Sequence, residues 1–215
     1  LDKKNLAEEL IQRRLAVTPD DPKLWNALGD LHMDTKYYVE AWERSGHRNA
    51  RSQRSLGRAA LRRKDWPAAA EHYGAAAVLN PLSVETWFSL GYAHVKCGNA
   101  DAALRAFTRV TQQDPAHGEA WNNVAALWTS LGRDAEAFSA LSECIKHKRE
   151  SWQVWENYAA VGARTGNHLQ ALRGLKMVLD LTSGRTLKTE VAEQLLAALE
   201  AWGQPKHAAN AANAV

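Results

Sequence analysis

The sequence has few cysteines, no long apolar run and no strand-like pattern, and each of these features narrows the class of protein. Only Cys97 and Cys144 occur among 215 residues, which suits a reducing compartment and provides no zinc-binding spacing. No uncharged apolar run approaches the roughly 18 residues that a transmembrane helix needs, so we expect no membrane span. No stretch alternates β-branched with polar residues, and we therefore expect an all-α protein.

Signatures of catalysis and of cofactor binding are missing as well. The eight histidines are scattered, and no H-x-x-x-H pair lies on one helical face, so we predict no metal site. There is no Gly-rich phosphate loop and no local nucleophile motif. Cys144 and His147 lie one helical turn apart, and we interpret them as a core cysteine beside a surface histidine. We predict that the protein is not an enzyme and binds no cofactor or small-molecule substrate.

A period of 34 residues organises most of the chain. It is carried by three sets of residues, each repeating at that interval: Trp87, Trp121 and Trp155; Gly98, Gly132 and Gly166; Ala103, Ala137 and Ala171. A fixed period of this length predicts a solenoid, in which stacked helix pairs bury the apolar faces that no single pair can bury alone. We expect helices near 84–97, 100–113, 118–131, 134–147, 152–165 and 168–181.

The pattern within one period resembles the tetratricopeptide repeat (TPR). The residues that match it in full are Trp87, Leu90, Gly91, Ala103, Phe107 and Pro115. The resemblance implies a right-handed superhelix of antiparallel helix pairs. The residues that we expect in the repeat core are Trp25, Gly29, Trp87, Gly91, Ala103, Phe107, Trp121, Ala137, Trp155 and Ala171.

We expect this superhelix to be a single domain over residues 1–202. The predicted parts are a partial repeat at 1–19, repeats at about 22–49, 50–83, 84–117, 118–151 and 152–185, a capping helix at 186–202 and a flexible tail at 203–215. The second repeat is irregular, because Trp25 and Gln53 are only 28 residues apart. This predicts a shortened second helix near 37–45 and more exposed groove surface.

Basic residues are concentrated in one block. Residues 44–64 contain eight Lys and Arg and no Asp or Glu, which leaves 19 basic against 24 acidic residues elsewhere. In a TPR, the second, fifth, ninth and thirteenth residues of the first helix face the concave groove. In the repeat that starts at Ala50 all four are arginine: Arg51, Arg54, Arg58 and Arg62. The following repeats contribute Phe88, Tyr92 and Asn122 to the same predicted groove.

Arginine can bind carboxylates or phosphates with two parallel hydrogen bonds. We therefore predict that the groove binds an acidic or phosphorylated segment of a protein partner. The alternative is a solvated face whose arginines pair with Asp30, Asp34 and Glu85. The two-carboxylate clamp that many TPR modules use for Hsp70 or Hsp90 tails is not reproduced, because Glu119 stands where a cation is needed.

Direct RNA binding is the main rival function. A basic helix with aromatic neighbours is typical of nucleic-acid surfaces, and residues 152–158 resemble the half-a-TPR repeats of RNA-processing factors. Against it, the basic block at 44–64 covers one repeat only, whereas tracking of phosphates needs a continuous basic stripe.

Departures from the general repeat resemble one TPR family in particular. Segments 37–45, 48–55, 87–91, 119–123 and 152–158 together are similar to the C-terminal repeats of the tetratricopeptide repeat protein 27 family. The resemblance implies a cytoplasmic or nuclear assembly factor, linked to Hsp90-assisted building of complexes such as the U5 spliceosomal particle. That family also has a large N-terminal helical region, and our chain begins at Leu1 without methionine, so we expect a fragment.

Overall fold

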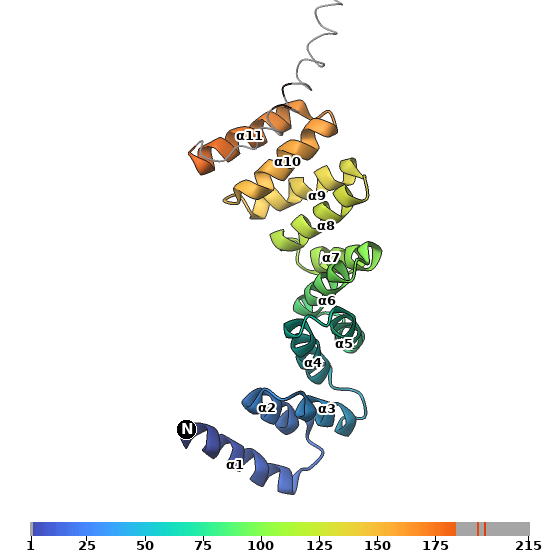
Figure 1. Cartoon of the computed structure of the whole chain (residues 1–215), viewed down its shortest axis with the longest axis vertical. Coiled ribbons are helices and arrows are strands. Elements are labelled where there is room, and N and C mark those ends of the chain that lie inside the picture. The colour runs from blue at the N-terminus through green and yellow to red at the C-terminus, as the bar shows by residue number, and fades with distance from the viewer. Residues whose placement is uncertain (1, 184–192, 194–195, 197–215) are drawn as a thin grey trace, which may run out of the picture. The chain divides into compact units, whose positions relative to one another are not determined.

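A computed structural model describes residues 2–183, together with Glu193 and Leu196. These residues are all-α, with no strand among them, as the sequence predicted (Figure 1). The helices in chain order are α1 (Asp2–Val17), α2 (Pro22–His32), α3 (Thr35–Arg44), α4 (Ala50–Arg62), α5 (Trp66–Leu79), α6 (Val84–Lys96), α7 (Ala100–Gln113), α8 (Gly118–Ser130), α9 (Asp134–His147), α10 (Trp152–Arg164) and α11 (His168–Thr182).

The chain divides into two compact units, Leu1–Gln113 and Asp114–Val215. In the first unit α1 precedes the helix pairs α2/α3, α4/α5 and α6/α7, and the second unit contains the pairs α8/α9 and α10/α11 (Figure 1). The single domain over 1–202 therefore stays a prediction. Apart from Glu193 and Leu196, the predicted capping helix at 186–202 and tail at 203–215 lie outside the described residues.

Helix ends in the regular repeats agree with the 34-residue period to within one residue. The turns after α6, α8 and α10 each contain a glycine with positive φ, of 73°, 71° and 76°. These are Gly98, Gly132 and Gly166, and glycine enters this left-handed conformation without the steric cost that a Cβ imposes. The glycines that set the period therefore end the helices.

The core of each pair is built from small residues that face large ones. Gly91 on α6 lies against Phe107 on α7, and a Cβ at Gly91 would come within 2.9 Å of that ring. The predicted core glycines and alanines are buried, as is Phe107, which is 1% exposed. The four predicted core tryptophans are only partly buried.

Each of these tryptophans has a second role, which the sequence did not predict. The indole Nε1 donates a hydrogen bond to the carbonyl oxygen of the residue six positions earlier in the chain. The pairs are Trp25 to Pro19 at 2.7 Å, Trp87 to Pro81 at 2.8 Å, Trp121 to Pro115 at 2.9 Å and Trp155 to Arg149 at 2.8 Å. Each tryptophan is thus hydrogen-bonded to the segment that precedes its own helix.

The irregular repeat is shorter in both helices. α2 has 11 residues and α3 has 10, whereas α6 and α7 have 13 and 14. At the tryptophan position of α4 stands Gln53, which is buried and lies 2.8 Å from the Nδ1 atom of His72 on α5. A hydrogen bond inside the helix pair thus replaces the bond to the preceding turn.

Candidate functional site

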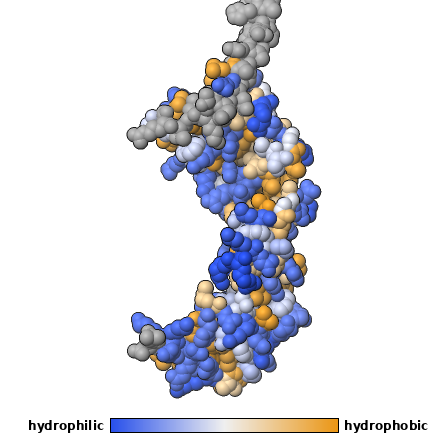
Figure 2. All heavy atoms as spheres, in the orientation of Figure 1, coloured by the Kyte–Doolittle hydropathy of each residue, from blue (hydrophilic) through white to orange (hydrophobic). Residues whose placement is uncertain are grey.

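α4 separates a buried face from a charged face. Its buried residues are small or apolar except for Gln53: Ser52, Gln53, Leu56, Gly57, Ala59 and Ala60. The four predicted arginines recur at intervals of three, four and four residues, which places them in one row along the helix. Arg51, Arg58 and Arg62 are exposed and Arg54 is half-buried, and Figure 2 shows a strongly hydrophilic patch over α4. We call this row the α4 face.

Two arginines of the α4 face are paired with acidic residues of neighbouring helices. Arg51 Nη2 lies 2.7 Å from Asp30 Oδ2 on α2, and Arg58 Nη2 lies 3.5 Å from Glu85 Oε1 on α6. Within the described part of the chain, Arg54 and Arg62 make no ion pair. The α4 face therefore has two neutralised and two unpaired guanidinium groups.

The pair between Asp30 and Arg51 is reinforced by a tyrosine. The Tyr38 hydroxyl donates to Asp30 Oδ1 at 2.9 Å, so that carboxylate is held by two side chains. Burial, with the hydrogen bond to Asp30, raises the pKa of Tyr38 to about 12, while Arg62 and Arg58 nearby oppose this shift. Asp34 pairs with Lys36 and takes no part in the α4 face.

The two predicted aromatic residues on α6, Phe88 and Tyr92, differ in their exposure and in their neighbours. Phe88 is half-buried and packs edge-on against Phe107, with ring centroids 5.4 Å apart. Tyr92 is 41% exposed, packs edge-on against Trp66 and lies under the Lys96 ammonium, which is 5.4 Å from its ring centroid. Of the two rings, Tyr92 offers more surface to a partner.

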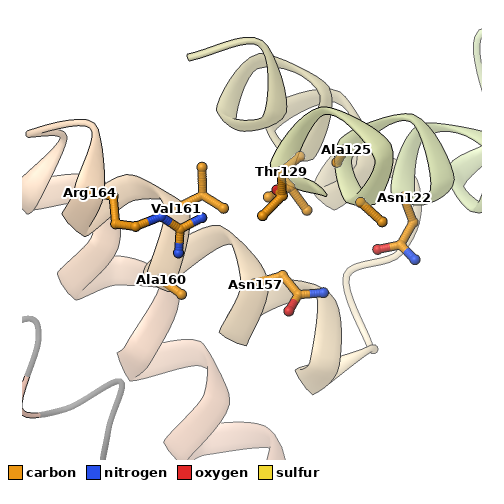
Figure 3. Close-up of a pocket in the computed structure, with 9 residues that line it drawn as sticks. Asn122, Ala125, Thr129, Asn157, Ala160, Val161 and Arg164 are labelled. Atoms are coloured by element: carbon orange, nitrogen blue, oxygen red, sulfur yellow. The ribbon is translucent and has the colours of Figure 1, made fainter. Parts of the chain in front are cut away.

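Asn122 belongs to the second unit, so the structure does not assign it to the α4 face. It lines a hollow of ≈ 240 Å³ between α8 and α10 (Figure 3). Asn157, Ala160 and Arg164 on α10 line the same hollow. Arg164 is not free, because its Nε and Nη2 atoms each lie 2.8 Å from a carboxylate oxygen of Asp134.

The hollow combines two amides with small side chains, and no pattern in the sequence predicted it. It depends on alanines from two helices, which the repeat pattern treats only as packing residues. Asn157 was not among the predicted site residues, although Asn122 was. The Arg164 guanidinium holds the pKa of Asp134 below its usual value, as expected for a paired carboxylate.

Other reactive groups do not form a site in the described residues. Cys144 is buried, its Sγ lies 3.2 Å from the carbonyl oxygen of Gly118, and burial raises the pKa of its thiol to about 11. A thiol in this environment is a poor nucleophile. No group of three or more metal-ligating side chains occurs in the part of the chain that was described. In that part, no helix is long and apolar enough to cross a membrane.

Comparison with known proteins identifies the repeats. The family model of the tetratricopeptide repeat matches residues 54–96 and 88–145. A TPR repeat-containing protein of Schizosaccharomyces pombe is 40% identical over 109 residues, and the tetratricopeptide repeat protein 27 homolog of Dictyostelium discoideum is 40% identical over 96. These matches cover 51% and 45% of our chain, and only 13% and 11% of the two relatives.

The fold is shared with solved structures of low sequence identity. One is YrrB, described as a TPR protein with an unusual peptide-binding site, which matches with a TM-score of 0.69 at 16% identity. That match covers 90% of our chain and 99% of YrrB. The arrangement of the helices is thus the one found in these repeats, which indicate a protein–protein interaction scaffold.

Proposed function

We propose that this chain, in which residues 54–145 match the tetratricopeptide repeat, is a non-catalytic scaffold. Its ligand would be an acidic or phosphorylated segment of a protein partner, bound on the α4 face. The observation that carries the proposal is the pair of guanidinium groups of the half-buried Arg54 and the exposed Arg62, which make no ion pair with any described residue. A guanidinium can grip a carboxylate or a phosphate with two parallel hydrogen bonds.

The neighbourhood of these arginines supports recognition of a peptide. Residues 44–64 contain no acidic side chain, and among the described residues only Asp30 and Glu85 on neighbouring helices form ion pairs with the α4 face. The exposed ring of Tyr92 on α6 supplies an apolar contact, as peptide-binding surfaces commonly do. The peptide-binding site named for YrrB supports the same kind of ligand for this fold.

The cellular role follows from the resemblance to the tetratricopeptide repeat protein 27 homolog. We propose a non-catalytic, chaperone-associated assembly factor for multiprotein complexes in the cytoplasm or nucleus. The spliceosomal U5 particle is one such complex. The chain spans only 13% and 11% of the length of the two relatives described above, which are much longer proteins.

RNA is the second candidate ligand, because the α4 face would attract nucleic-acid phosphates too. The two carboxylates argue against it. Asp30 and Glu85 lie directly beside Arg51 and Arg58, and they interrupt the row of positive charge that a phosphate backbone would follow. A peptide whose acidic groups are separated by neutral residues can place those groups on the unpaired arginines and avoid the two carboxylates.

The test is a quantitative pull-down from nuclease-treated extract. The double variant Arg54→Glu/Arg62→Glu is compared with Arg105→Glu/Arg109→Glu on α7, which changes the net charge of the same unit equally and lies outside the α4 face. After circular dichroism shows both variants folded, we expect the first to lose a protein partner that the second retains. Equal recovery by both variants contradicts the proposal. Capture that occurs in untreated extract and is absent from nuclease-treated extract favours RNA.

A further inference from the structure

We infer that the α4 face selects its partner by spacing. It accepts two anionic groups about 12 Å apart, one on Arg54 and one on Arg62, while Asp30 and Glu85 keep Arg51 and Arg58 from binding a third. The inference rests on the proposed function and adds the register of the partner segment. Asp30 and Glu85 are then specificity-determining residues.

The spacing follows from helix geometry. Arg54 and Arg62 are eight residues apart on α4, which is about 12 Å at a rise of about 1.5 Å per residue. An extended peptide advances about 3.3 Å per residue and places alternate side chains on one side. Acidic residues four positions apart are therefore about 13 Å apart on the same side and fit the two arginines. Spacings of two or six residues give about 7 or 20 Å and do not fit.

The two paired arginines are held to different degrees. Asp30 accepts from both Arg51 and Tyr38, which fixes the carboxylate that neutralises Arg51. The pair between Arg58 and Glu85 is longer, at 3.5 Å, and both side chains are more than half exposed. A ligand would therefore find Arg51 firmly occupied and Arg58 loosely occupied.

Glu85 also restricts the residue between the two acidic groups. Arg58 lies midway between Arg54 and Arg62 on α4, and its partner Glu85 stands beside that midpoint. An acidic side chain in the middle of the partner segment would meet Glu85 and be repelled. The expected motif is an acidic residue, three residues without negative charge, and a second acidic residue.

The direct test uses three labelled nonapeptides of one composition, each with two phosphoserines placed two, four or six residues apart. Fluorescence anisotropy at physiological salt measures their affinities for the whole chain. We expect the four-residue spacing to bind roughly two- to fivefold more tightly than either of the others, because only it engages both unpaired arginines. Equal affinities for the three peptides overturn the inference.

The second test removes the acidic partners of Arg51 and Arg58. In Asp30→Asn/Glu85→Gln, Arg51 and Arg58 lose their partners, and we expect the two-residue peptide to gain roughly two- to fivefold in affinity. Glu71→Gln/Asp101→Asn removes the same charge from exposed positions of the same unit and serves as the control. A gain of equal size in both variants shows a general charge effect and overturns the inference.

These outcomes separate the inference from the proposed function. If Arg54→Glu/Arg62→Glu abolishes binding of all three peptides but spacing has no effect, the function stands and the selection by spacing is wrong. If no peptide binds, or if oligouridine binds more tightly than every peptide, both are wrong. Discrimination by spacing that disappears in Arg54→Glu/Arg62→Glu supports both.

Discussion

Arg62 and Arg164 occupy the same position of the repeat, three periods apart, in two different electrostatic settings. On α4 in the first unit, Arg62 makes no ion pair with any described residue. On α10 in the second unit, Arg164 is bound by Asp134 through two hydrogen bonds of 2.8 Å. The position in the repeat sets the place of the residue on its helix. Whether its charge is available to a partner depends on the acidic residues of the neighbouring helix.

The same contrast extends along the helices. The positions taken by Arg54 and Arg58 on α4 are taken by Asn122 and Ala126 on α8, where they line the hollow beside the paired Arg164. The first unit thus has an exposed basic row and the second an amide-lined hollow on an equivalent scaffold. Residues that face outward can change in this fold because packing depends on the opposite side of each helix.

The largest expected effect concerns the scaffold that both units share. Phe107 and Leu141 occupy one repeat position and are 1% and 2% exposed. We expect Phe107→Ala to lower the free energy of unfolding by about 3–5 kcal/mol and Leu141→Ala by about 2–5 kcal/mol, through lost contacts and the cavity left behind. Urea denaturation followed by circular dichroism measures both.

The control for these core substitutions is Leu82→Ala, because Leu82 is 81% exposed. Its free energy of unfolding should stay within about 0.5 kcal/mol of the wild type. A comparable loss of unfolding free energy for Leu82→Ala would show that exposed leucines also stabilise the units. It would contradict the distinction between core and surface positions.

The second prediction compares the two arginines directly. Arg164→Met removes a partly exposed bidentate pair and should lower the free energy of unfolding by roughly 0.5–1 kcal/mol, a value already reduced for solvent screening. Arg62→Met removes no ion pair within the described residues and should change it by less than about 0.5 kcal/mol. Equal losses in urea denaturation would mean that both arginines contribute through their aliphatic stems.

The third prediction transfers charge to the second unit. Ala126→Arg places a guanidinium on the exposed position of α8 that corresponds to Arg58. We expect the variant to bind a singly phosphorylated peptide roughly two- to fivefold more tightly, because one exposed ion pair is gained. Ala126→Gln, of similar length but without charge, is the control, and anisotropy is the measurement.

The smallest effect at neutral pH concerns Tyr38. Its pKa of about 12 means that it keeps its proton when ordinary tyrosines ionise near pH 10, so Tyr38 should titrate late in near-ultraviolet absorbance. Burial also raises the pKa of Tyr73, so the late signal of Tyr38 is identified by its loss in Tyr38→Phe. Since the pKa is raised in the folded state, stability is lost as the pH rises from about 10 towards about 12. Asp30→Asn should bring the transition of Tyr38 to lower pH. An unchanged titration curve would show that Asp30 does not contribute to the raised pKa of Tyr38.

The sequence predicted the fold well because the residues that repeat every 34 positions determine where helices begin and end. Glycines at turns and the recurring tryptophans mark helix ends, and these placed the regular helices to within one residue. The shortened helix near 37–45 was also predicted, and it is observed as α3 (Thr35–Arg44). Such features depend on local conformation and spacing, which a sequence displays directly.

The site could be predicted only in part, because it depends on distances between helices. The common row of the four arginines follows from their spacing on one helix. Which of them would be paired did not follow, since Asp30, Asp34 and Glu85 were all possible partners and only Asp30 and Glu85 reach the α4 face. The hollow beside Asn157 was missed because two helices must meet to form it.

The bond from each indole to the carbonyl six residues earlier has an evolutionary consequence. Donor and acceptor are only six residues apart, so a segment that is duplicated or deleted with its ends outside those six residues leaves the pair intact. A bond between helices of two repeats behaves differently, such as the one that Asn26 on α2 donates to Ser52 on α4 at 3.2 Å. That bond joins two segments, and gene rearrangement there would separate its partners. The α2–α4 region should therefore be inherited as a single block, with the α4 face inside it.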